Sequence, residues 1–327
     1  MIANRKILHF IQIMRRKRQQ ILLFLNILLF LTLSLKTFGS REPPPPWPPI
    51  LSKFRKKPDT QSVTSKLANI AEMETSWCSS YLNDMNELPN RKHRKQWEFC
   101  WIAHALDHFK KLHEESKGLG FAVGKEPLAS YFVKRGTSVT ISDLPIEKET
   151  GGWSETGQHA AELEATYRNG VVDYDSYKRK AKFIPVDMNH IPVDMLQGEY
   201  DFLWSSSSLE HVGKIELGKK FIVNSMRALK VGGIAVHTTE FCINSENYAG
   251  RDEIMHMQVW LKKDVDDLSR SLEDAGCKLY PVQYALGRSK ENLRVDEEPY
   301  RASNHMNLVV ASNVVHTSIG LIIERTK

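Results

Sequence analysis

Two carboxylates stand where predicted strands end, a position typical of a site for a ribose-containing cofactor. Asp143 ends a predicted strand over residues 138–143, about twenty residues after a Gly turn at 120–124. Asp187 lies near the end of another short predicted strand, over residues 183–188. A Gly-rich turn lets a cofactor approach the backbone closely, and an acid at the next strand end binds the two ribose hydroxyls. The pattern therefore predicts a nucleotide-type cofactor, although many folds share it.

Two histidines are candidates to take a proton from an acceptor group. His211 follows a predicted strand that begins at Tyr200 and runs into a serine-rich turn. Histidine titrates near neutral pH, and strand ends face the site in a parallel α/β sheet, so His211 is the first candidate base. A helix-capping or cofactor-side role for Glu210 and His211 stays open. His237, at the end of the strand after the Gly232-Gly233 turn, is the second candidate.

These residues need a sheet to position them, and strands alternate with helices from Gly118 onward. Before that point, apolar residues recur at three- and four-residue spacing from Trp97 to Leu112, which predicts a helix that ends near Ser116. The alternation after Gly118 predicts a parallel α/β sheet. Later segments predict one further helix and three strands, over residues 262–272, 278–282, 308–311 and 317–323.

At this point the order of motifs resembles the class I S-adenosylmethionine-dependent methyltransferases, especially the type 11 group. The segment YDFLWSSSSLEHV stands where the family has its fourth strand, and LKVGG precedes the fifth. The resemblance covers residues 118–236 and, less closely, the rest to Arg325. It implies a Rossmann-like, doubly wound α/β fold with a seven-stranded sheet whose last strand is antiparallel. It also implies S-adenosyl-L-methionine as the cofactor.

The resemblance assigns roles to individual residues. Asp143 would hold the ribose hydroxyls, and Asp187 with Met188 would flank the adenine. Gly124 and its neighbours, Gly120 and Ala122 among them, would lie under the methionine part. The floor near the transferable methyl group would be lined by two serines, Ser205 and Ser206.

The Gly turn departs from the family pattern, which has an acid two places before Gly-x-Gly-x-Gly. Gly120 stands where that acid is expected, Ala122 replaces the first Gly, and Glu126 replaces the third. A carboxylate beside an ammonium is favourable in either place. Our hypothesis is that Glu126 takes over the contact with the methionine ammonium.

The N-terminal part predicts a membrane anchor. A basic tail over residues 1–20 precedes an uncharged apolar run, Ile21 to Leu35, and we expect a transmembrane signal anchor over residues 21–38. A cleaved signal peptide and a buried core helix are the alternatives. Positive charge is denser before the run, which favours a single-pass type II protein with its domain in the Golgi or another secretory lumen.

Two segments separate this anchor from the predicted catalytic domain. Residues 39–60 contain Pro43–Pro46 and, after Trp47, Pro48 and Pro49, which predicts a polyproline II stem. Residues 61–116 are expected to form a helical extension, and residues 117–327 the methyltransferase domain. The folded part is expected to begin between Thr60 and Thr75.

Charge and cysteine composition argue against some classes of ligand. The net charge of +6, with a pI near 9.0, is concentrated near the N-terminus, and a clustered excess does not predict nucleic-acid binding. Four cysteines stand far apart without a CxxC pair, so no zinc site is predicted. We expect Cys78 to pair with Cys100 in a luminal protein, with four buried thiols as the alternative. A metal site from His237, Glu240 and His256 has no spacing that enforces it, so no metal is predicted.

These observations predict a membrane-tethered methyltransferase that acts on a hydroxyl of a sugar, a glycan or another small molecule. The glycan step rests on analogy with methyltransferases of surface-glycan synthesis and on the predicted topology. A nicotinamide-dependent oxidoreductase on the same plan is an alternative, but the sequence lacks a Tyr-x-x-x-Lys pair after the fourth strand. A non-catalytic scaffold that has lost its cofactor is the other alternative, motivated by the altered Gly turn.

Overall fold

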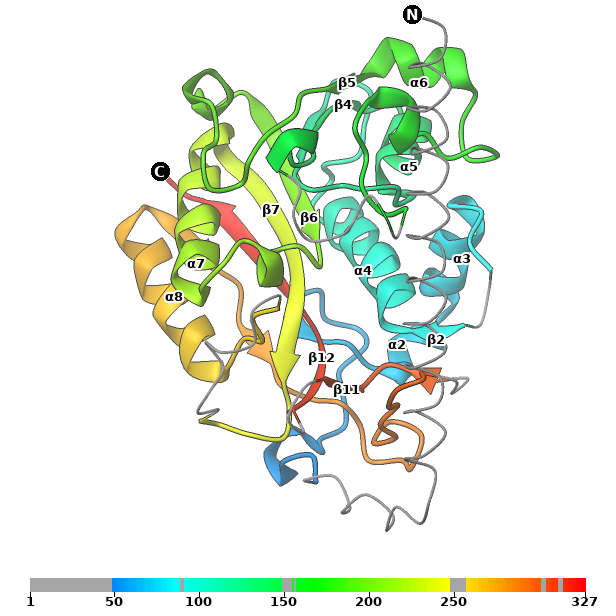
Figure 1. Ribbon diagram of the computed structural model, residues 1–327, viewed down its shortest axis with the longest axis vertical. Helices are drawn as coiled ribbons and strands as arrows, with labels where there is room; N and C mark the ends of the chain where they lie inside the picture. Colours follow the sequence, from blue (N-terminus) through cyan, green and yellow to red (C-terminus); the bar gives the residue numbers. More distant parts are fainter. Residues whose placement is uncertain are drawn as a thin grey trace, which may run out of the picture. The chain divides into compact units, whose positions relative to one another are not determined.

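The computed structural model describes residues 49–88, 91–148, 155, 157–247, 257–300, 304–310 and 314–327. The predicted basic tail and anchor, and the prolines of the predicted stem up to Pro48, lie outside these residues. In the part of the chain that the structure describes, no helix is both long and apolar enough to cross a bilayer. The described chain surrounds one large twisted sheet (Figure 1).

Seven strands of this sheet form the predicted mostly parallel sheet with an antiparallel last strand. Five neighbours run parallel in the order β5-β4-β3-β6-β7, and β12 then pairs antiparallel with both β7 and β8. This confirms the predicted α/β class and the mostly parallel sheet with an antiparallel last strand. The bounds are β3 Lys117–Gly120, β4 Ser138–Ile141, β5 Ala181–Phe183, β6 Tyr200–Ser206, β7 Leu229–Cys242, β8 Cys277–Leu279 and β12 Val314–Arg325.

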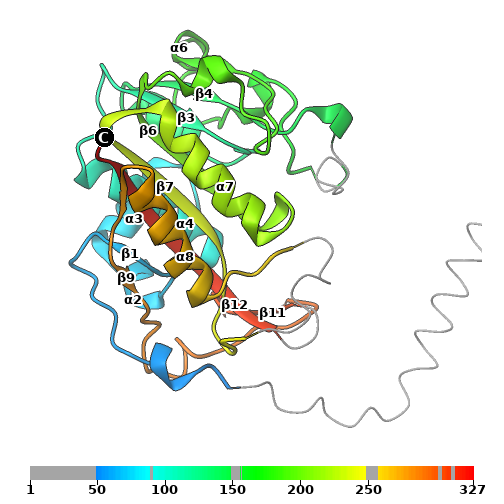
Figure 2. The same ribbon diagram turned by 90° about the vertical axis from the view of Figure 1, so that its left-hand side faces the viewer.

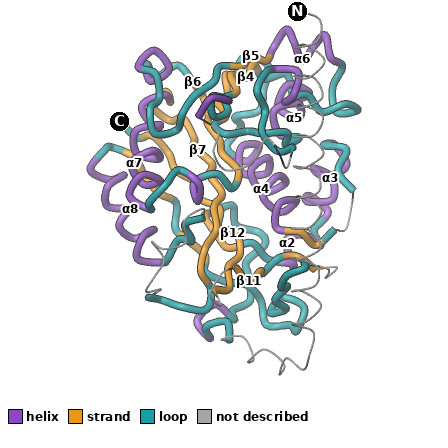
Figure 3. Tube along the Cα trace, in the orientation of Figure 1, coloured by secondary structure: helices purple, strands orange, loops and turns teal. Residues whose placement is uncertain are grey.

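Helices cover both faces of the sheet. Helices α7 and α8 lie side by side on one face, whereas α3 and α4 lie on the other (Figures 1 and 2). The tube trace shows the strand layer between these two groups of helices (Figure 3). The bounds are α2 Ile70–Met73, α3 Ser76–Asp84, α4 Arg94–His108, α5 Leu128–Lys134, α6 Tyr174–Lys180, α7 Ile215–Ser225 and α8 Lys262–Asp274.

Helix α4 docks on the sheet through two stacked tryptophans. Trp97 and Trp101 are buried, with ring centroids 5.3 Å apart. A Cβ atom on Gly320 of β12 would lie 2.3 Å from the Trp101 ring, so only glycine lets the helix approach this closely. The helix ends at His108, earlier than the predicted end near Ser116, because Lys110 adopts a left-handed conformation with φ +54°.

The predicted helical extension also supplies strands. β1 (Ser65–Leu67) joins the large sheet beside β12, with β9 (Val282–Gln283) on its other side. β2 (Lys92–His93) pairs with β10 (Asn304–His305) in a separate two-stranded sheet. β11 (Leu308–Val310) pairs antiparallel with β12. Residues 61–116 are therefore part of the same α/β body, not a separate helical layer.

The folded body begins before the predicted Thr60 boundary. Ile50 and Phe54 are buried, and the Phe54 ring packs edge-on against Phe241 at 5.8 Å between centroids. The Leu51 amide donates to the Ile243 carbonyl. The end of the predicted stem is therefore anchored to β7 and its following loop.

One disulfide bond joins two helices of the N-terminal part. Cys78 of α3 is bonded to Cys100 of α4, as the sequence predicted. Both sulfurs lie in the hydrophobic core. Cys242 and Cys277 are also buried.

Candidate cofactor and acceptor site

A cavity of about 660 Å³ opens beyond the carboxyl ends of β3, β4 and β6. This is the edge of a parallel sheet where ligands bind in doubly wound folds. Residues from α4, the Gly turn, the loops after β4 and β5, and the serine turn after β6 line it. Of the predicted site residues, the lining includes Ala122, Gly124, Glu126, Asp143, Asp187, Met188, Ser206 and His211.

The Gly turn follows β3 and forms one wall. Ala122 and Gly124 both have positive φ values, +49° and +54°. At Gly124 a Cβ atom would also lie 2.8 Å from the Gln158 carbonyl oxygen, so this position requires glycine. Gly120 lies at the end of β3, outside the cavity lining, because the Trp204 side chain occupies the space beside it.

Asp143 follows β4 and is held by backbone amides. Its Oδ1 accepts from the Leu144 amide at 2.8 Å, and its Oδ2 accepts from the Ala160 amide at 3.0 Å. Burial raises the pKa of this carboxyl above its usual value, against the opposing effect of these hydrogen bonds. The carboxyl is therefore fixed in place with lone pairs left to accept from a ligand hydroxyl.

Asp187 and Met188 follow β5 and line the same cavity. The strand ends at Phe183, earlier than predicted, because Pro185 lacks an amide donor. Burial alone would raise the pKa of Asp187, but hydrogen bonds from His190 and Asn189 and the Lys148 ammonium hold it below its usual value. An ionised carboxylate here is suited to accept hydrogen bonds from an exocyclic amine.

Glu126 lies on the cavity wall, between the Gly turn and β6. Its Oε1 accepts from the Trp204 indole at 3.2 Å. Burial raises the pKa of this carboxyl to about 8, against the charge of Lys95 and hydrogen bonds from Trp204 and Ser206. A carboxyl that is so poorly solvated gains most from a cationic ligand.

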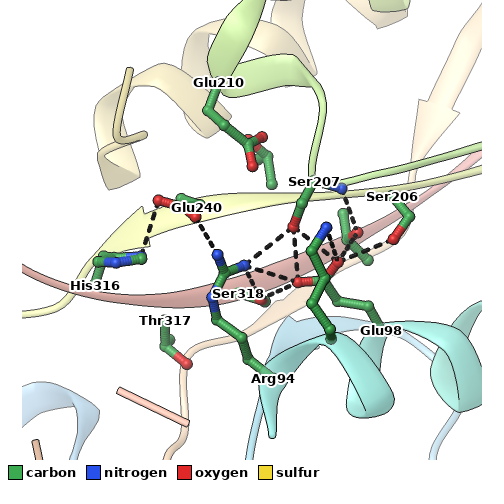
Figure 4. A network of polar contacts seen from close by, with 12 residues as sticks. Arg94, Glu98, Ser206, Ser207, Glu210, Glu240, His316, Thr317 and Ser318 are labelled. Atoms are coloured by element: carbon green, nitrogen blue, oxygen red, sulfur yellow. Dashed lines mark hydrogen bonds and ion pairs between the residues drawn. The ribbon is translucent and has the colours of Figure 1, made fainter. Parts of the chain in front are cut away.

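The serine turn after β6 is fixed by a buried carboxylate from α4. Glu98 accepts hydrogen bonds from Ser206 at 3.0 Å and from Ser207 at 2.8 Å, and from Thr238 of β7 at 3.1 Å (Figure 4). Ser318 of β12 also donates to it. Ser207 has a φ of +45°, so these bonds hold the turn in a conformation that serine rarely adopts.

Charges complete this network. Arg94 donates to Glu98 at 3.1 Å and pairs with Glu240 of β7, and the Lys95 ammonium lies 3.7 Å from Glu98. Burial would raise the pKa of Glu98, but these two cations and the serine hydroxyls lower it to about 2. Glu240 lies 3.1 Å from the His316 Nδ1 (Figure 4). The carboxylate Glu98 is therefore ionised and fully satisfied.

The two candidate bases lie in different places. His211 lines the cavity at the serine-turn end. His237 is fully buried on the other face of the sheet, where its ring packs edge-on against Phe221 of α7 at 5.9 Å. Burial lowers the pKa of His237 to about 3. The structure therefore does not bring His237 to the cavity, and its buried neutral ring is a poor base.

Ser205 lies on the same face of the sheet as His237, away from the cavity. Its Oγ lies 2.8 Å from the His237 Nδ1, and neither residue belongs to the cavity lining. Successive strand residues point to opposite faces of a sheet, so only Ser206 of the serine pair faces the cavity. The predicted role of Ser205 on the cavity floor does not match this placement.

The structure adds residues that sequence reasoning missed. Lys95 and Phe99 of α4 line the cavity, as do Gln158 and His159 from the loop after β4. The short-range motifs carry no signal for them, because they come from a distant helix and an irregular loop. In the described residues, no group of three or more His, Cys, Asp or Glu side chains could hold a metal ion. His256 lies outside those residues.

Comparison with known proteins finds similarity in structure alone. No family model matches the sequence, and no curated protein matches it. The geranyl diphosphate C-methyltransferase from Streptomyces coelicolor A3(2), crystallised with S-adenosyl-L-homocysteine, is 12% identical with a TM-score of 0.47, and the match covers 85% of this chain and 90% of that one.

Two further solved structures show a similar, low level of sequence identity and structural similarity. The magnesium protoporphyrin IX methyltransferase from Synechocystis PCC 6803, with bound S-adenosyl-L-homocysteine, is 14% identical with a TM-score of 0.38, covering 68% of this chain and 80% of that one. A putative methyltransferase from Bacillus halodurans C-125 is 16% identical with a TM-score of 0.41, covering 68% and 97%. Such distant likeness leaves the function to be argued from this chain's own residues.

Proposed function

We propose that this chain is an S-adenosylmethionine-dependent methyltransferase that methylates a hydroxyl group of a sugar, a glycan or another small acceptor. One observation carries the proposal: a single cavity gathers the Gly turn, Asp143, Asp187, Met188, Glu126 and Ser206 at the carboxyl edge of the sheet. These are the residue types that the adenine, ribose and methionine parts of such a cofactor need.

The residues fit the cofactor by their chemistry. Asp143 would accept from the ribose hydroxyls, while Asp187 and Met188 would flank the adenine. Glu126 would face the methionine ammonium, whose charge would offset the cost of ionising this buried carboxyl. The sulfonium of the cofactor supplies the activated methyl group, so the protein needs mainly to align the acceptor.

His211 is the proposed base for the acceptor hydroxyl. It lies on the cavity wall just after the serine turn. In this role its imidazole takes the hydroxyl proton as the new oxygen–carbon bond forms. The protein would then release the methylated acceptor and S-adenosyl-L-homocysteine.

The test of the cofactor is calorimetric titration of the full chain in detergent with S-adenosyl-L-homocysteine. We expect binding that weakens about 10- to 100-fold in Asp143→Ala, because hydrogen bonds to a charged group contribute about 1.5–3 kcal/mol. Asp175→Ala is the matched control, since that side chain is 78% exposed on α6, and it should bind like the wild type.

The same titration separates the alternatives. If the folded wild-type chain does not bind S-adenosyl-L-homocysteine, the result would favour a non-catalytic scaffold that has lost cofactor binding through its altered Gly turn. Equal binding by wild type and Asp143→Ala would remove the ribose assignment while leaving the cofactor in place.

We also propose that the domain lies in a secretory lumen, held by the predicted anchor over residues 21–38. The apolar run behind a basic tail supports this, as does the Cys78–Cys100 disulfide, because disulfides persist in oxidising compartments. In sealed microsomes an added protease should leave residues from Pro48 onward intact until detergent is added. Digestion without detergent would place the domain on the cytosolic side.

A further inference from the structure

Lys95 is a cation of the cavity wall with hydrogen-bonding capacity left for a ligand. It lies in the first turn of α4 and lines the cavity together with Phe99, one turn further along the helix. Its side chain is 33% exposed. Its ammonium donates no hydrogen bond to a described residue, since the ion pair with Glu98 spans 3.7 Å. The three N–H donors of this ammonium are therefore open to a ligand.

Glu98 is satisfied without a hydrogen bond from Lys95. The hydrogen bonds to its two oxygens come from Arg94, Ser206, Ser207, Thr238 and Ser318. Lys95 adds charge at a longer distance. It can therefore bind an anionic group of a ligand without breaking any of these buried hydrogen bonds.

Strand β6 brings Lys95 close to Glu126. Trp204 and Ser206 are two residues apart in the strand, so their side chains lie on the same face, about 7 Å apart. Trp204 donates to Glu126 at 3.2 Å. Ser206 donates at 3.0 Å to the Glu98 Oε2, the same atom that lies 3.7 Å from the Lys95 ammonium. A carboxyl and an ammonium therefore lie near each other in one cavity.

This pair of groups is complementary to the head of an α-amino acid, in which an ammonium and a carboxylate share one carbon. The methionine part of the proposed cofactor has such a head. If Glu126 contacts its ammonium, its carboxylate lies close to that contact and loses hydration in the cavity. A hydrogen bond from a lysine ammonium to a carboxylate is about twice as strong as one between neutral groups, so Lys95 can replace that hydration.

The other two lysines of the cavity lining are less suited to this carboxylate. Lys148 donates to Asp187 at 3.3 Å, beside the proposed adenine site. Lys125 is next to Glu126 in the chain, but it is exposed, so water and salt screen its charge more strongly.

We propose that Lys95 binds the carboxylate of the cofactor's methionine part while Glu126 binds its ammonium. This inference rests on the proposed methyltransferase function and adds a cofactor-binding residue from α4. The two side chains together select a zwitterionic cofactor over one that has lost its carboxylate. Two fixed charges also orient the neighbouring sulfur, which carries the methyl group.

The test is calorimetric titration of the full chain in detergent with S-adenosyl-L-homocysteine, its decarboxylated analogue and its deaminated analogue. In Lys95→Met we expect the Kd for S-adenosyl-L-homocysteine to rise about tenfold or more, and the Kd for the decarboxylated analogue to stay unchanged. Glu126→Gln should weaken binding of the decarboxylated analogue and leave that of the deaminated one unchanged. Because no acceptor is present, these losses report on the cofactor alone.

The controls separate charge recognition from folding. Lys95→Arg keeps the positive charge and should keep most of the affinity for S-adenosyl-L-homocysteine. Lys262→Met makes the same change at a 49% exposed lysine of α8, which pairs with Asp266, and should bind like the wild type. Lys95→Gln, which keeps a polar side chain, is the second variant if Lys95→Met does not fold.

The outcomes are distinguishable. An unchanged Kd for S-adenosyl-L-homocysteine in Lys95→Met, or an equal loss of affinity for it and for the decarboxylated analogue, would overturn this inference alone. A selective loss that appears in Lys125→Met and not in Lys95→Met would do the same. Failure of the wild-type chain to bind S-adenosyl-L-homocysteine would overturn the proposed function, and this inference with it.

Discussion

Asp143 is held by backbone amides and Asp187 by a surface lysine and its own loop, whereas Glu98 is held by side chains from α4, β6, β7 and β12. The first arrangement joins residues at most 39 positions apart, and the second joins residues up to 220 positions apart. The second is both a wall of the site and a part of the core. We call the part of the cavity around Asp143 and Asp187, which we propose holds the adenosine, the adenosine end, and the part around Ser206–Ser208 the serine-turn end.

The largest effect should follow removal of Glu98. Glu98→Ala leaves Arg94 buried without one of its carboxylates, and breaking a buried pair in this way costs about 3–5 kcal/mol in the free energy of unfolding. Glu74→Ala is the control, because that glutamate is 59% exposed and pairs with Lys92 at the surface, so its loss should cost less than about 1 kcal/mol. Urea denaturation measures both, and equal losses would contradict the comparison.

Low pH should remove the difference in the free energy of unfolding between the wild type and Glu98→Ala. The pKa of Glu98 is lowered from 4.5 in the unfolded chain to about 2 in the folded one. Its contribution is therefore fully present above pH 4.5 and is lost as the pH falls toward 2. The stability gap between wild type and Glu98→Ala should narrow over that range, and a constant gap would show that Glu98 acts by packing alone.

Substitution of His211, which lines the cavity, and of His237, which is buried on the other face of the sheet, should have different effects. His211→Ala should reduce kcat about 100-fold with cofactor affinity intact, because a positioned base contributes about 10²–10⁴-fold. His237→Ala removes the Ser205 hydrogen bond on the far face, so it should lower stability and leave kcat nearly unchanged. Steady-state kinetics with calorimetry distinguishes them, and a kcat loss confined to His237→Ala would reverse the assignment.

The pH dependence of cofactor binding tests Glu126. Because its pKa is raised to about 8 in the free protein and the ammonium favours the ionised form, affinity should increase about tenfold per pH unit between pH 6 and 8. In Glu126→Gln the affinity should be weaker and nearly independent of pH over this range. Titration with S-adenosyl-L-homocysteine measures it, and parallel curves for the two proteins would exclude the contact.

The smallest effect concerns Ala122. Its φ of +49° costs an L-residue about 1 kcal/mol relative to glycine. Ala122→Gly should therefore raise the free energy of unfolding by up to about 1 kcal/mol and leave cofactor affinity unchanged. Thermal denaturation measures it, and a loss of stability would mean that the methyl group contributes packing that outweighs the strain.

The adenosine end could be predicted from sequence because its residues follow short strands with turn signals. Asp143, Asp187 and Gly124 each lie within a few residues of the element that positions them, and the fold class follows from the alternation of those elements. Strand periodicity also indicates that only one of the two serines at the end of β6 faces the cavity. Because neighbouring strand residues face opposite ways, Ser205 and Ser206 could not both face the cavity.

The serine-turn end could not be predicted in the same way. No local pattern indicates that Glu98, which precedes the Gly turn, accepts hydrogen bonds from Ser207, Thr238 and Ser318. Those contacts depend on how α4 docks against β12, which is set by the Trp101–Gly320 contact. Buried polar partners of this kind are defined by tertiary packing rather than by spacing along the chain.

Helix α4 lies ahead of the strand–helix alternation in sequence, yet it supplies part of the cavity wall through Lys95 and Phe99 and holds the serine turn through Glu98. A fragment beginning at Lys117 would keep the Gly turn, Asp143 and Asp187 and lose that part of the wall. Substitutions at Phe99 would therefore reshape the cavity from a single helix without replacing any residue that we propose binds the cofactor.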